Sequence, residues 1–356
     1  MTLNKNDSVL WLAHVAKEFF PAWQDRLNRS EKQTIKSLGH NFYSVQFSST
    51  PTRGYLSESI FSRYWLPVQY MWPTKCEEKG YIEKCAQGLL AKFKDKNFGN
   101  VVVFSLDRKQ QKLASNLRGR ILQVFSAKLK EKSPTKLLTE WTKKPVLQPI
   151  YNQTLIVAIS DKCTWAGLST PSEAGSFFAG GRRYVGVSNE SIASRAAAKF
   201  VEATESLQLS GIKTDNAKKW LELGAAPGGI THELIEKKCE VWAVDKADMD
   251  EDIVENPLVH FYKIDAREFK VRMTFDALMC DLNGPAFLSA KICSEKTSLL
   301  RKGGIIIHTL KIHSANEFEK DYELTLKEFA LQNCQFLYAR HLYNNKQEVT
   351  LFFKKK

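Results

Sequence analysis

The stretch from Lys219 to Asp245, KWLELGAAPGGITHELIEKKCEVWAVD, constrains the fold more than any other part of this chain. Its pattern predicts a short apolar strand at 220–223, a Gly-rich turn at 224–229, an amphipathic helix, and a second strand at 241–244 that ends in Asp245. This order is typical of a βαβ unit in an α/β domain. The turn then lies at the carboxyl end of the first strand, where such domains bind their ligands.

The composition of the turn favours a nucleotide-like ligand. Gly224, Gly228 and Gly229 leave backbone N–H groups and the start of the following helix open to a bound molecule. Asp245 ends the next strand, where a carboxylate can accept hydrogen bonds from ribose hydroxyls. The stretch contains neither G-x-G-x-x-G nor G-x-x-x-x-G-K-[ST], so it carries no dinucleotide or triphosphate motif. The alternative is a turn that only connects two elements and binds nothing.

Length and composition bound the broad class. The chain has 356 residues, of which 43% are hydrophobic, so we expect two or three domains with substantial cores. It lacks an apolar run of ~20 residues and a signal-peptide pattern, which predicts a cytoplasmic protein without a membrane anchor. The seven cysteines are scattered without C-x-x-C, so neither a disulfide framework nor a zinc site is expected. His308 lies inside an apolar strand and is expected to be a hydrogen-bonded core imidazole, not a metal ligand.

The positive charge is unevenly distributed. Residues 1–190 contain 28 Lys+Arg and 15 Asp+Glu, whereas residues 191–356 contain 24 of each, so the whole net charge of +13 falls in the first part. This asymmetry indicates a polyanion-binding region joined to a neutral domain that carries the chemistry. The alternative is a basic surface that serves only solubility.

Residues 1–70 are predicted to form a small α+β domain. Val9–Leu12 and Phe42–Phe47 have the alternation of strands, and Val15–Leu27 has apolar residues at helical spacing between them. Nothing in this region suggests catalysis.

Residues 71–170 are predicted to form a second α+β domain, with a basic amphipathic helix over 113–130 and paired strands at 154–159 and 163–168. Their order and charge resemble a THUMP domain, which implies RNA binding. A role in binding another partner, or a purely structural role, is the alternative.

Residues 171–192 are rich in Gly and Ser and are predicted to be a linker. Within it, Arg182 and Arg183 are either phosphate-binding groups at the mouth of an active site or an ordinary solvated pair.

Residues 193–356 are predicted to form a doubly wound α/β domain. A helix is expected from Ser194, with Ser191 or Asn189 as its cap. Further strands are expected at 259–264, 275–280 and 304–310, and a closing hairpin at 336–342 and 349–353. The sheet is therefore expected to be mostly parallel and Rossmann-like, with a closing antiparallel strand.

The motifs of this domain resemble those of S-adenosylmethionine (SAM) methyltransferases, and in particular the FtsJ-like ribose 2'-O-methyltransferases. The glycine turn has the form G-A-x-P-G-G, and an S-R-x-x-x-K helix precedes it at Ser194–Lys199. An L-K strand end at Lys311 and a closing L-Y-x-x-x-x-E-V-T at Leu342–Thr350 match as well. The resemblance is strong over 190–356 and faint over 1–150. It is closest to the bacterial enzymes that methylate a cytidine ribose in 23S ribosomal RNA.

The resemblance implies a set of site residues. The catalytic residues would be Lys199, Asp281, Lys311 and Glu348. The residues around SAM would be Ala196, Gly224, Ala226, Pro227, Gly228, Gly229, Asp245, Asp265 and Asp281. Asp265 would accept the adenine amino group. The chain departs from the family pattern at Ala196, where a hydroxyl is frequent, at Phe200 and Ile230, and at Asn283-Gly284.

The implied chemistry requires a base for a weakly acidic ribose hydroxyl. Lys311 is the predicted general base, although an ordinary lysine has a pKa of about 10.4 and is protonated at neutral pH. Burial and the neighbouring Lys199 ammonium are expected to lower the pKa of Lys311. Asp281 and Glu348 are expected to orient the two lysines. In-line methyl transfer from a sulfonium needs no metal, and none is predicted.

The sequence thus predicts a SAM-dependent RNA ribose 2'-O-methyltransferase that acts on a cytidine of large-subunit (23S) rRNA. One alternative is the same reaction on tRNA or another RNA. Another is a non-catalytic RNA-binding or assembly factor that retains a SAM pocket. Base methylation is disfavoured because N-P-P-Y-type motifs and a catalytic cysteine pair are missing.

Overall fold

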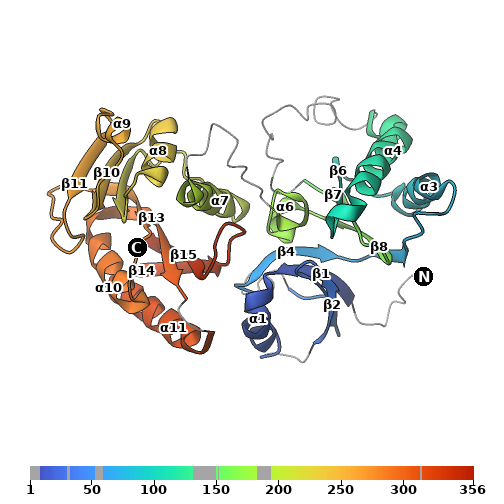
Figure 1. The fold of residues 1–356 in the computed structure, drawn as a ribbon, viewed down its shortest axis with the longest axis horizontal. Coiled ribbons are helices and arrows are strands. Elements are labelled where there is room, and N and C mark those ends of the chain that lie inside the picture. The colour runs from blue at the N-terminus through green and yellow to red at the C-terminus, as the bar shows by residue number, and fades with distance from the viewer. Residues whose placement is uncertain are drawn as a thin grey trace. The chain divides into compact units, whose positions relative to one another are not determined.

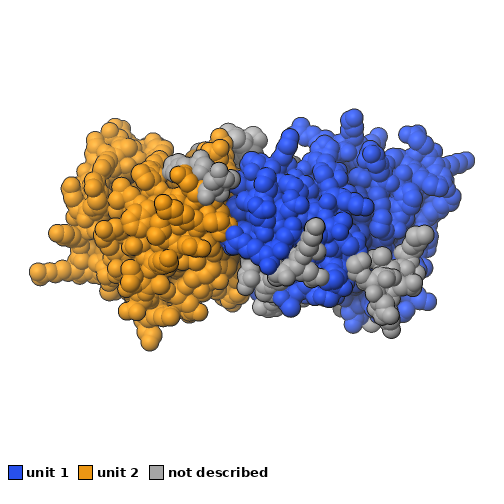
Figure 2. All heavy atoms as spheres, turned by 90° about the horizontal axis from the view of Figure 1, so that it is seen from below, with its two compact units in different colours: residues 1–182 blue, residues 183–356 orange. Residues whose placement is uncertain are grey.

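The computed structural model describes residues 9–29, 33–52, 59–130, 150, 152–182, 194–312 and 315–356. The chain divides into two compact units, residues 1–182 and 183–356 (Figure 2). Both units contain sheets covered by helices (Figure 1).

The first sheet of unit 1 is antiparallel, in the order β2-β3-β1-β4. Its elements are β1 (Val9–Val15), η1 (Lys17–Phe19), α1 (Phe20–Leu27), β2 (Thr34–Gly39), β3 (Phe42–Phe47) and β4 (Ser62–Pro67). The predicted helix over Val15–Leu27 begins later, because β1 continues through Val15 and a proline follows the first residue of α1. β2 was not predicted, because it has no buried residue and therefore no apolar alternation.

The second sheet of unit 1 has the order β5-β8-β7-β6, with β6 and β7 parallel and the other pairs antiparallel. Its strands are β5 (Tyr70–Pro73), β6 (Asn100–Ser105), β7 (Thr154–Ile159) and β8 (Cys163–Ser169). The helical segments are α3 (Tyr81–Phe93), η2 (Arg108–Gln110), α4 (Gln111–Lys130), α6 (Pro171–Ala174) and η3 (Ala179–Gly181). Apolar residues of α3 and α4 pack together against β6 and β7, which forms one core cluster.

The two sheets of unit 1 share a second core cluster. Leu12 and Tyr64 of the first sheet pack there with Ile156 and Trp165 of the second. At Gly167 of β8 a Cβ would lie 1.8 Å from the carbonyl oxygen of Pro67, so only glycine allows this approach. The domain limits predicted at residues 70 and 170, and the THUMP resemblance, stay predictions.

The predicted linker begins with ordered structure. Thr170 and Glu173 form a capping box at the start of α6. Arg182 donates hydrogen bonds to the carbonyls of Ser105 and Leu106 and stacks over Phe42, so the structure gives its guanidinium an internal role. Arg183 lies outside the described residues.

Unit 2 contains a seven-stranded sheet in the order β11-β10-β9-β12-β13-β15-β14. Its strands are β9 (Lys219–Leu223), β10 (Glu240–Asp245), β11 (Val259–Lys263), β12 (Phe275–Cys280), β13 (Leu300–Lys311), β14 (Cys334–Arg340) and β15 (Glu348–Lys355). The five strands from β11 to β13 in this order are parallel to one another. β15 pairs antiparallel with both β13 and β14. The predicted Rossmann-like sheet with a closing antiparallel strand is confirmed.

Helices cover both faces of this sheet (Figure 1). They are α7 (Arg195–Leu209), α8 (Gly229–Glu236), α9 (Glu251–Val254), α10 (Ala286–Lys296), η4 (Thr297–Leu299) and α11 (Ala315–Leu331). α7 and α8 pack on the face that carries Met279 and Ile307, whereas Phe329 of α11 stacks on Phe353 of the other face. Because both faces are buried, the central strands are continuous apolar runs.

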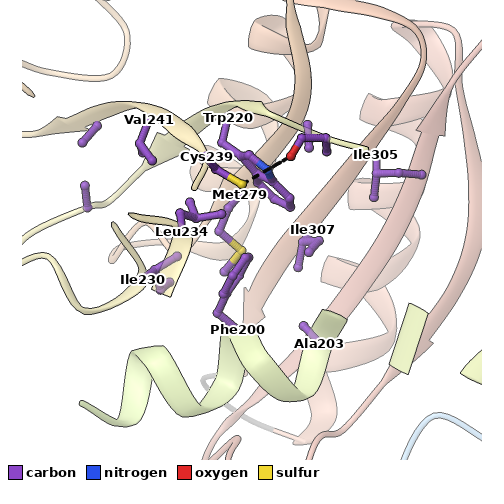
Figure 3. Close-up of a cluster of buried hydrophobic side chains, with 14 of the residues drawn as sticks. Phe200, Ala203, Trp220, Ile230, Leu234, Cys239, Val241, Met279, Ile305 and Ile307 are labelled. Atoms are coloured by element: carbon purple, nitrogen blue, oxygen red, sulfur yellow. Dashed lines mark hydrogen bonds between the residues drawn. The ribbon is translucent and has the colours of Figure 1, made fainter. Parts of the chain in front are cut away.

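Phe200, at which the sequence departs from the pattern of the family it resembles, anchors α7 in the core. It points into a cluster with Met279 and Ile307 (Figure 3) and meets Trp220 edge-to-face, with ring centroids 5.4 Å apart. Such aromatic pairs stabilise a core beyond their buried area. Phe200 therefore fixes the helix that carries Lys199.

Within the described part of the chain, no helix combines the length and apolar character needed to cross a bilayer.

Candidate active site

A cavity of about 720 Å³ opens at the carboxyl edge of the parallel strands in unit 2. This is the edge at which open α/β sheets bind ligands. Its walls include the following residues of the predicted site: Ala196, Lys199, Gly224, Ala226, Pro227, Gly229, Asp245, Asp265, Asp281, Lys311 and Glu348. The structure therefore gathers residues of α7, α8, β10, β13 and β15, and of the loops after β9, β11 and β12, around one space.

Gly228 is the one predicted site residue that does not line the cavity. Its φ is +116°, and a Cβ there would lie 2.5 Å from Cδ1 of Ile253. Its role in this structure is to let the turn pack against the segment that carries Met249 and Ile253.

Gly224 joins the glycine turn to the neighbouring strand end. It has φ +83°, and a Cβ would lie 2.8 Å from both the carbonyl carbon and the oxygen of Asp281. A left-handed backbone and a contact with rigid main chain both require glycine. The glycine turn and the main chain of Asp281, which both line the cavity, are thus in direct contact.

Gly229 performs a similar role toward α7. A Cβ at Gly229 would lie 2.0 Å from the hydroxyl of Ser194, which caps α7 by accepting a hydrogen bond from the Ala197 N–H at 3.2 Å. The cap is therefore Ser194, not the predicted Ser191 or Asn189, which lie outside the described residues.

Four of the predicted residues form a closed ring of ion pairs, here called the tetrad: Lys199, Asp281, Lys311 and Glu348. Lys199 Nζ lies 2.8 Å from Asp281 and 2.9 Å from Glu348. Lys311 Nζ lies 2.6 Å from the other oxygen of Asp281 and 2.9 Å from that of Glu348. Each carboxylate therefore bridges both lysines.

The tetrad is assembled by the topology of the sheet. Asp281 follows β12 and Lys311 ends β13, which are parallel neighbours. Glu348 begins the antiparallel strand β15 and is paired in register with Lys311. Lys199 reaches the same point from the second turn of α7. The side chains are between 8% and 16% exposed, so solvent screens the pairs weakly.

The electrostatics keep both carboxylates charged. Burial tends to raise the pKa of Asp281 and Glu348, but the charges of Lys199 and Lys311, and hydrogen bonds from them, outweigh burial and lower both pKa values. Stabilisation from such groups is present above their unfolded pKa and is lost as pH falls through the folded pKa.

The prediction that the pKa of Lys311 is lowered is wrong for this structure. Burial does act to lower it, but the charge of Asp281 and hydrogen bonds from Lys311 to Asp281 and Glu348 raise it above its ordinary value. The two carboxylates in contact therefore outweigh the effect of burial. A base at this position must therefore release a proton that the tetrad itself holds.

Asp245 and Asp265 already have partners in the cavity wall. Asp245 accepts hydrogen bonds from the N–H groups of Ala226 at 3.0 Å and Ala247 at 2.9 Å, which fixes its carboxylate against the glycine turn. Asp265 is paired with Arg267 and Lys246, and hydrogen bonds from them lower its pKa. A ligand group at Asp265 would share the carboxylate with these cations or displace one.

Glu222 is a site residue that the sequence analysis missed. It lies on β9, lines the cavity and is only 1% exposed. Oε2 accepts a 2.7 Å hydrogen bond from Thr231, whereas Oε1 has no hydrogen-bond partner. Burial, together with the charges of Asp281 and Asp245, raises the pKa of Glu222 to about 8. An acid in the middle of an apolar strand was the available signal.

A second cluster lies on the other face of the sheet. The side-chain donor atoms of Cys280, Cys293 and His308 are within 4.8 Å of one another, and all three residues are fully buried. His308 is a core residue as predicted, but neither ring nitrogen meets hydrogen-bond geometry with a partner. Structural zinc sites have four ligands. Only three donors converge here among the described residues, so we assign no metal to the cluster.

Known proteins that are similar to this chain include methyltransferases. Residues 192–352 match the family model described as FtsJ-like methyltransferase. The chain is similar to "Ribosomal RNA large subunit methyltransferase M" of Marinobacter nauticus, with 27% identity over 147 residues, which cover 39% of each protein. The protein of the same name from Thauera aminoaromatica is 27% identical over 165 residues, or 45% of each. The matched region spans less than half the length of these relatives.

Among solved structures, fibrillarin from Aeropyrum pernix in complex with S-adenosyl-L-methionine is similar at a TM-score of 0.36 and 15% identity. That comparison covers 59% of this chain and 85% of fibrillarin.

Proposed function

We propose that this chain, whose residues 192–352 form an FtsJ-like methyltransferase domain, is a SAM-dependent methyltransferase that modifies a ribose 2'-hydroxyl of large-subunit ribosomal RNA. One observation carries the proposal: two lysines and two carboxylates form a closed ring on the wall of the cavity that also contains the glycine turn. The names of the relatives support the choice of ribosomal RNA.

The residues of the cavity fit SAM, which carries a sulfonium and an ammonium group. Asp245 is held at the end of β10, where it can accept hydrogen bonds from the ribose hydroxyls of the cofactor. Glu222 provides a buried carboxyl oxygen without a hydrogen-bond partner in the same wall, and this oxygen can accept a hydrogen bond from the ammonium group. The narrow approach at Gly224 keeps the turn free of side chains.

When bound, SAM supplies an electrophilic methyl group. The tetrad then acts on the ribose hydroxyl that attacks it. Lys311, in its neutral form, accepts the hydroxyl proton at Nζ as the new oxygen–carbon bond forms and the carbon–sulfur bond breaks. Asp281 and Glu348 hold Lys311 in place, and Lys199 keeps both carboxylates charged and oriented. Lys311 would end the step protonated at Nζ.

Unit 1 is proposed to hold the RNA. The positive excess of the chain lies in residues 1–190, which fits a polyanionic substrate. A cavity of about 470 Å³ between β5 and α3 places the rings of Tyr70, Trp72 and Tyr81 near Lys75 and Lys92. Aromatic rings beside lysines suit unpaired bases and their phosphates.

The test is methyl transfer from labelled SAM to ribosomal RNA, with mass mapping of the methylated nucleotide. Lys311→Ala should lower the rate by about 10²–10⁴-fold and leave SAM affinity unchanged. Lys302→Ala is the matched control, because Lys302 is an exposed lysine of the same strand. Wild-type turnover in folded, SAM-binding Lys311→Ala would refute the assignment.

The same experiment separates the other candidates. Ribose methylation of tRNA in preference to ribosomal RNA would favour the same chemistry on another substrate. SAM binding without transfer to any RNA would favour a non-catalytic RNA-binding or assembly factor.

A further inference from the structure

Glu202 connects the helix that carries Lys199 to the loop that delivers Glu348. It lies on α7, three residues after Lys199 and therefore on the same side of the helix. Its Oε1 accepts a 2.6 Å hydrogen bond from the backbone N–H of Tyr343. Its Oε2 accepts two more from Asn344, at 3.0 Å from the backbone N–H and 2.8 Å from the side-chain amide.

These contacts hold one end of a short connection. Residues 341–347 join β14 to β15, and Glu348 follows directly. The loop is tied internally by His341 Nε2 to the Lys346 carbonyl at 3.1 Å, and to β13 by the Ile312 N–H, which donates to the Gln347 carbonyl at 2.8 Å. From α7, Glu202 contacts the segment 341–348 near its beginning, and Lys199 contacts it at its end.

We propose that Glu202 is a positioning residue for the methyl-transfer reaction: it clamps the loop to α7 so that Glu348 meets Lys199 and Lys311 together. The inference rests on the proposed function, and it adds a residue that touches neither the tetrad nor the cavity wall.

The identity of the side chain matters. Three donors converge on two carboxylate oxygens, and hydrogen bonds to a charged acceptor are stronger than those to a neutral one. In Glu202→Gln, one oxygen becomes an NH₂ group, which faces N–H donors and cannot accept from them. The variant keeps the size of the side chain but only one neutral acceptor oxygen, so at least one of the three hydrogen bonds is lost and the others are weakened.

The kinetic test compares Glu202→Gln with Glu236→Gln, the same change at an exposed position of α8. We expect Glu202→Gln to lower kcat roughly tenfold without changing the KM for SAM, because displaced catalytic groups slow the chemical step. The control should match wild type. A rise in KM for SAM with unchanged kcat would overturn the proposal.

The pH profile separates positioning from a general loss of stability. Lys311 is surrounded by Asp281, Glu348 and Lys199, and the charge of Glu348 is one of the causes that raise its pKa. A displaced Glu348 raises the pKa of Lys311 less than a well-placed one. The pH range over which kcat increases should therefore shift to lower pH in Glu202→Gln. In a Glu348→Gln background the same substitution should cause no further shift. An unshifted profile in the first case, or an equal shift in both, would contradict positioning through Glu348.

Hydrogen exchange tests the clamp without reference to activity. The amides of Tyr343 and Asn344 should exchange faster in Glu202→Gln than in wild type, whereas the amides of the central strand β12 should not change. If wild type shows no methyl transfer but these amides lose protection, the proposed function fails and the clamp stands. Unchanged protection at Tyr343 and Asn344 would refute the clamp itself.

Discussion

The cavity of unit 2 contains two buried acidic regions with opposite electrostatics. In the tetrad, Asp281 and Glu348 each contact two lysines, and their pKa values are lowered despite burial. Beneath the glycine turn, Glu222 has one hydroxyl partner and no cation, and its pKa is raised to about 8. Glu222 is more deeply buried than the tetrad carboxylates and has no contacting cation, and both differences favour its neutral form.

The two regions also respond to pH with opposite signs. The carboxylates of the tetrad stabilise the folded state above their unfolded pKa and lose that contribution only in acid. Glu222 binds its proton more tightly in the folded state, so the free energy of unfolding falls as pH rises from about 4.5 to about 8. One cavity therefore contains carboxylates that stabilise the fold when ionised and a carboxyl group, Glu222, that stabilises it when protonated.

Asp281→Asn should have the largest effect, because it removes a charge on which two lysines depend. We expect about 3–5 kcal/mol less stability, as for other broken buried ion pairs, and methyl transfer slower by about a hundredfold or more. Denaturant unfolding at pH 7 and single-turnover kinetics measure the two effects. A loss below about 1 kcal/mol would show that the pairs behave like exposed ones.

Glu222→Gln should give the opposite result in the same assay. The amide has no charge to bury, so the variant should gain stability relative to wild type as pH rises from 5 to 8. The difference in unfolding free energy between the variant and wild type should grow by about 1.4 kcal/mol per pH unit and approach a few kcal/mol near pH 8. Unfolding free energies measured at intervals of one pH unit give this difference directly. A difference that is independent of pH would mean that Glu222 is already ionised when folded.

The rate of methyl transfer should follow the ionisation of Lys311. Because the pKa of Lys311 is raised, single-turnover rates should increase about tenfold per pH unit across neutral pH. Lys311→Ala should retain a slow rate without this dependence. A flat wild-type profile would assign proton removal to another group.

Thr231→Val should have the smallest effect. It removes the 2.7 Å hydrogen bond to Glu222 at nearly constant size and should cost about 1 kcal/mol. Because that bond favours the charged form, the pKa of Glu222 should rise further above about 8. Thr325→Val is the control, since Thr325 is a buried helix threonine whose hydroxyl donates a hydrogen bond to the Asp321 carbonyl. If the unfolding free energies of both variants depended on pH in the same way, Thr231 would not influence the pKa of Glu222.

The sequence predicted those parts of the site that follow from the sheet. The carboxyl ends of the parallel strands carry Asp245, Asp281 and Lys311. Their common edge of the sheet therefore follows from the strand pattern of the sequence. The predicted contact of Lys199 with Asp281 depended on the family resemblance, because a lysine on a helix carries no distinctive pattern.

Other features depend on packing and were not predictable. The sequence marks Glu222 as an acid inside an apolar strand, but its burial depends on the packing of α8, whose Thr231 contacts it. Glu202 acquires its partners from a loop some 140 residues away. The pKa of Lys311 is raised because two carboxylates contact it, and the number of contacting carboxylates cannot be deduced from residue spacing in the sequence. Among the helices, α10 was missed because its buried and exposed residues show little periodicity.

The contact between Gly224 and the main chain of Asp281 bears on how variants of this protein will be interpreted. Any larger side chain at position 224 must push on the segment that supports a catalytic carboxylate. Such a variant would lose affinity for the cofactor and speed of the chemical step together. A mutational scan that assigns each position to either cofactor binding or turnover will therefore assign Gly224 to both.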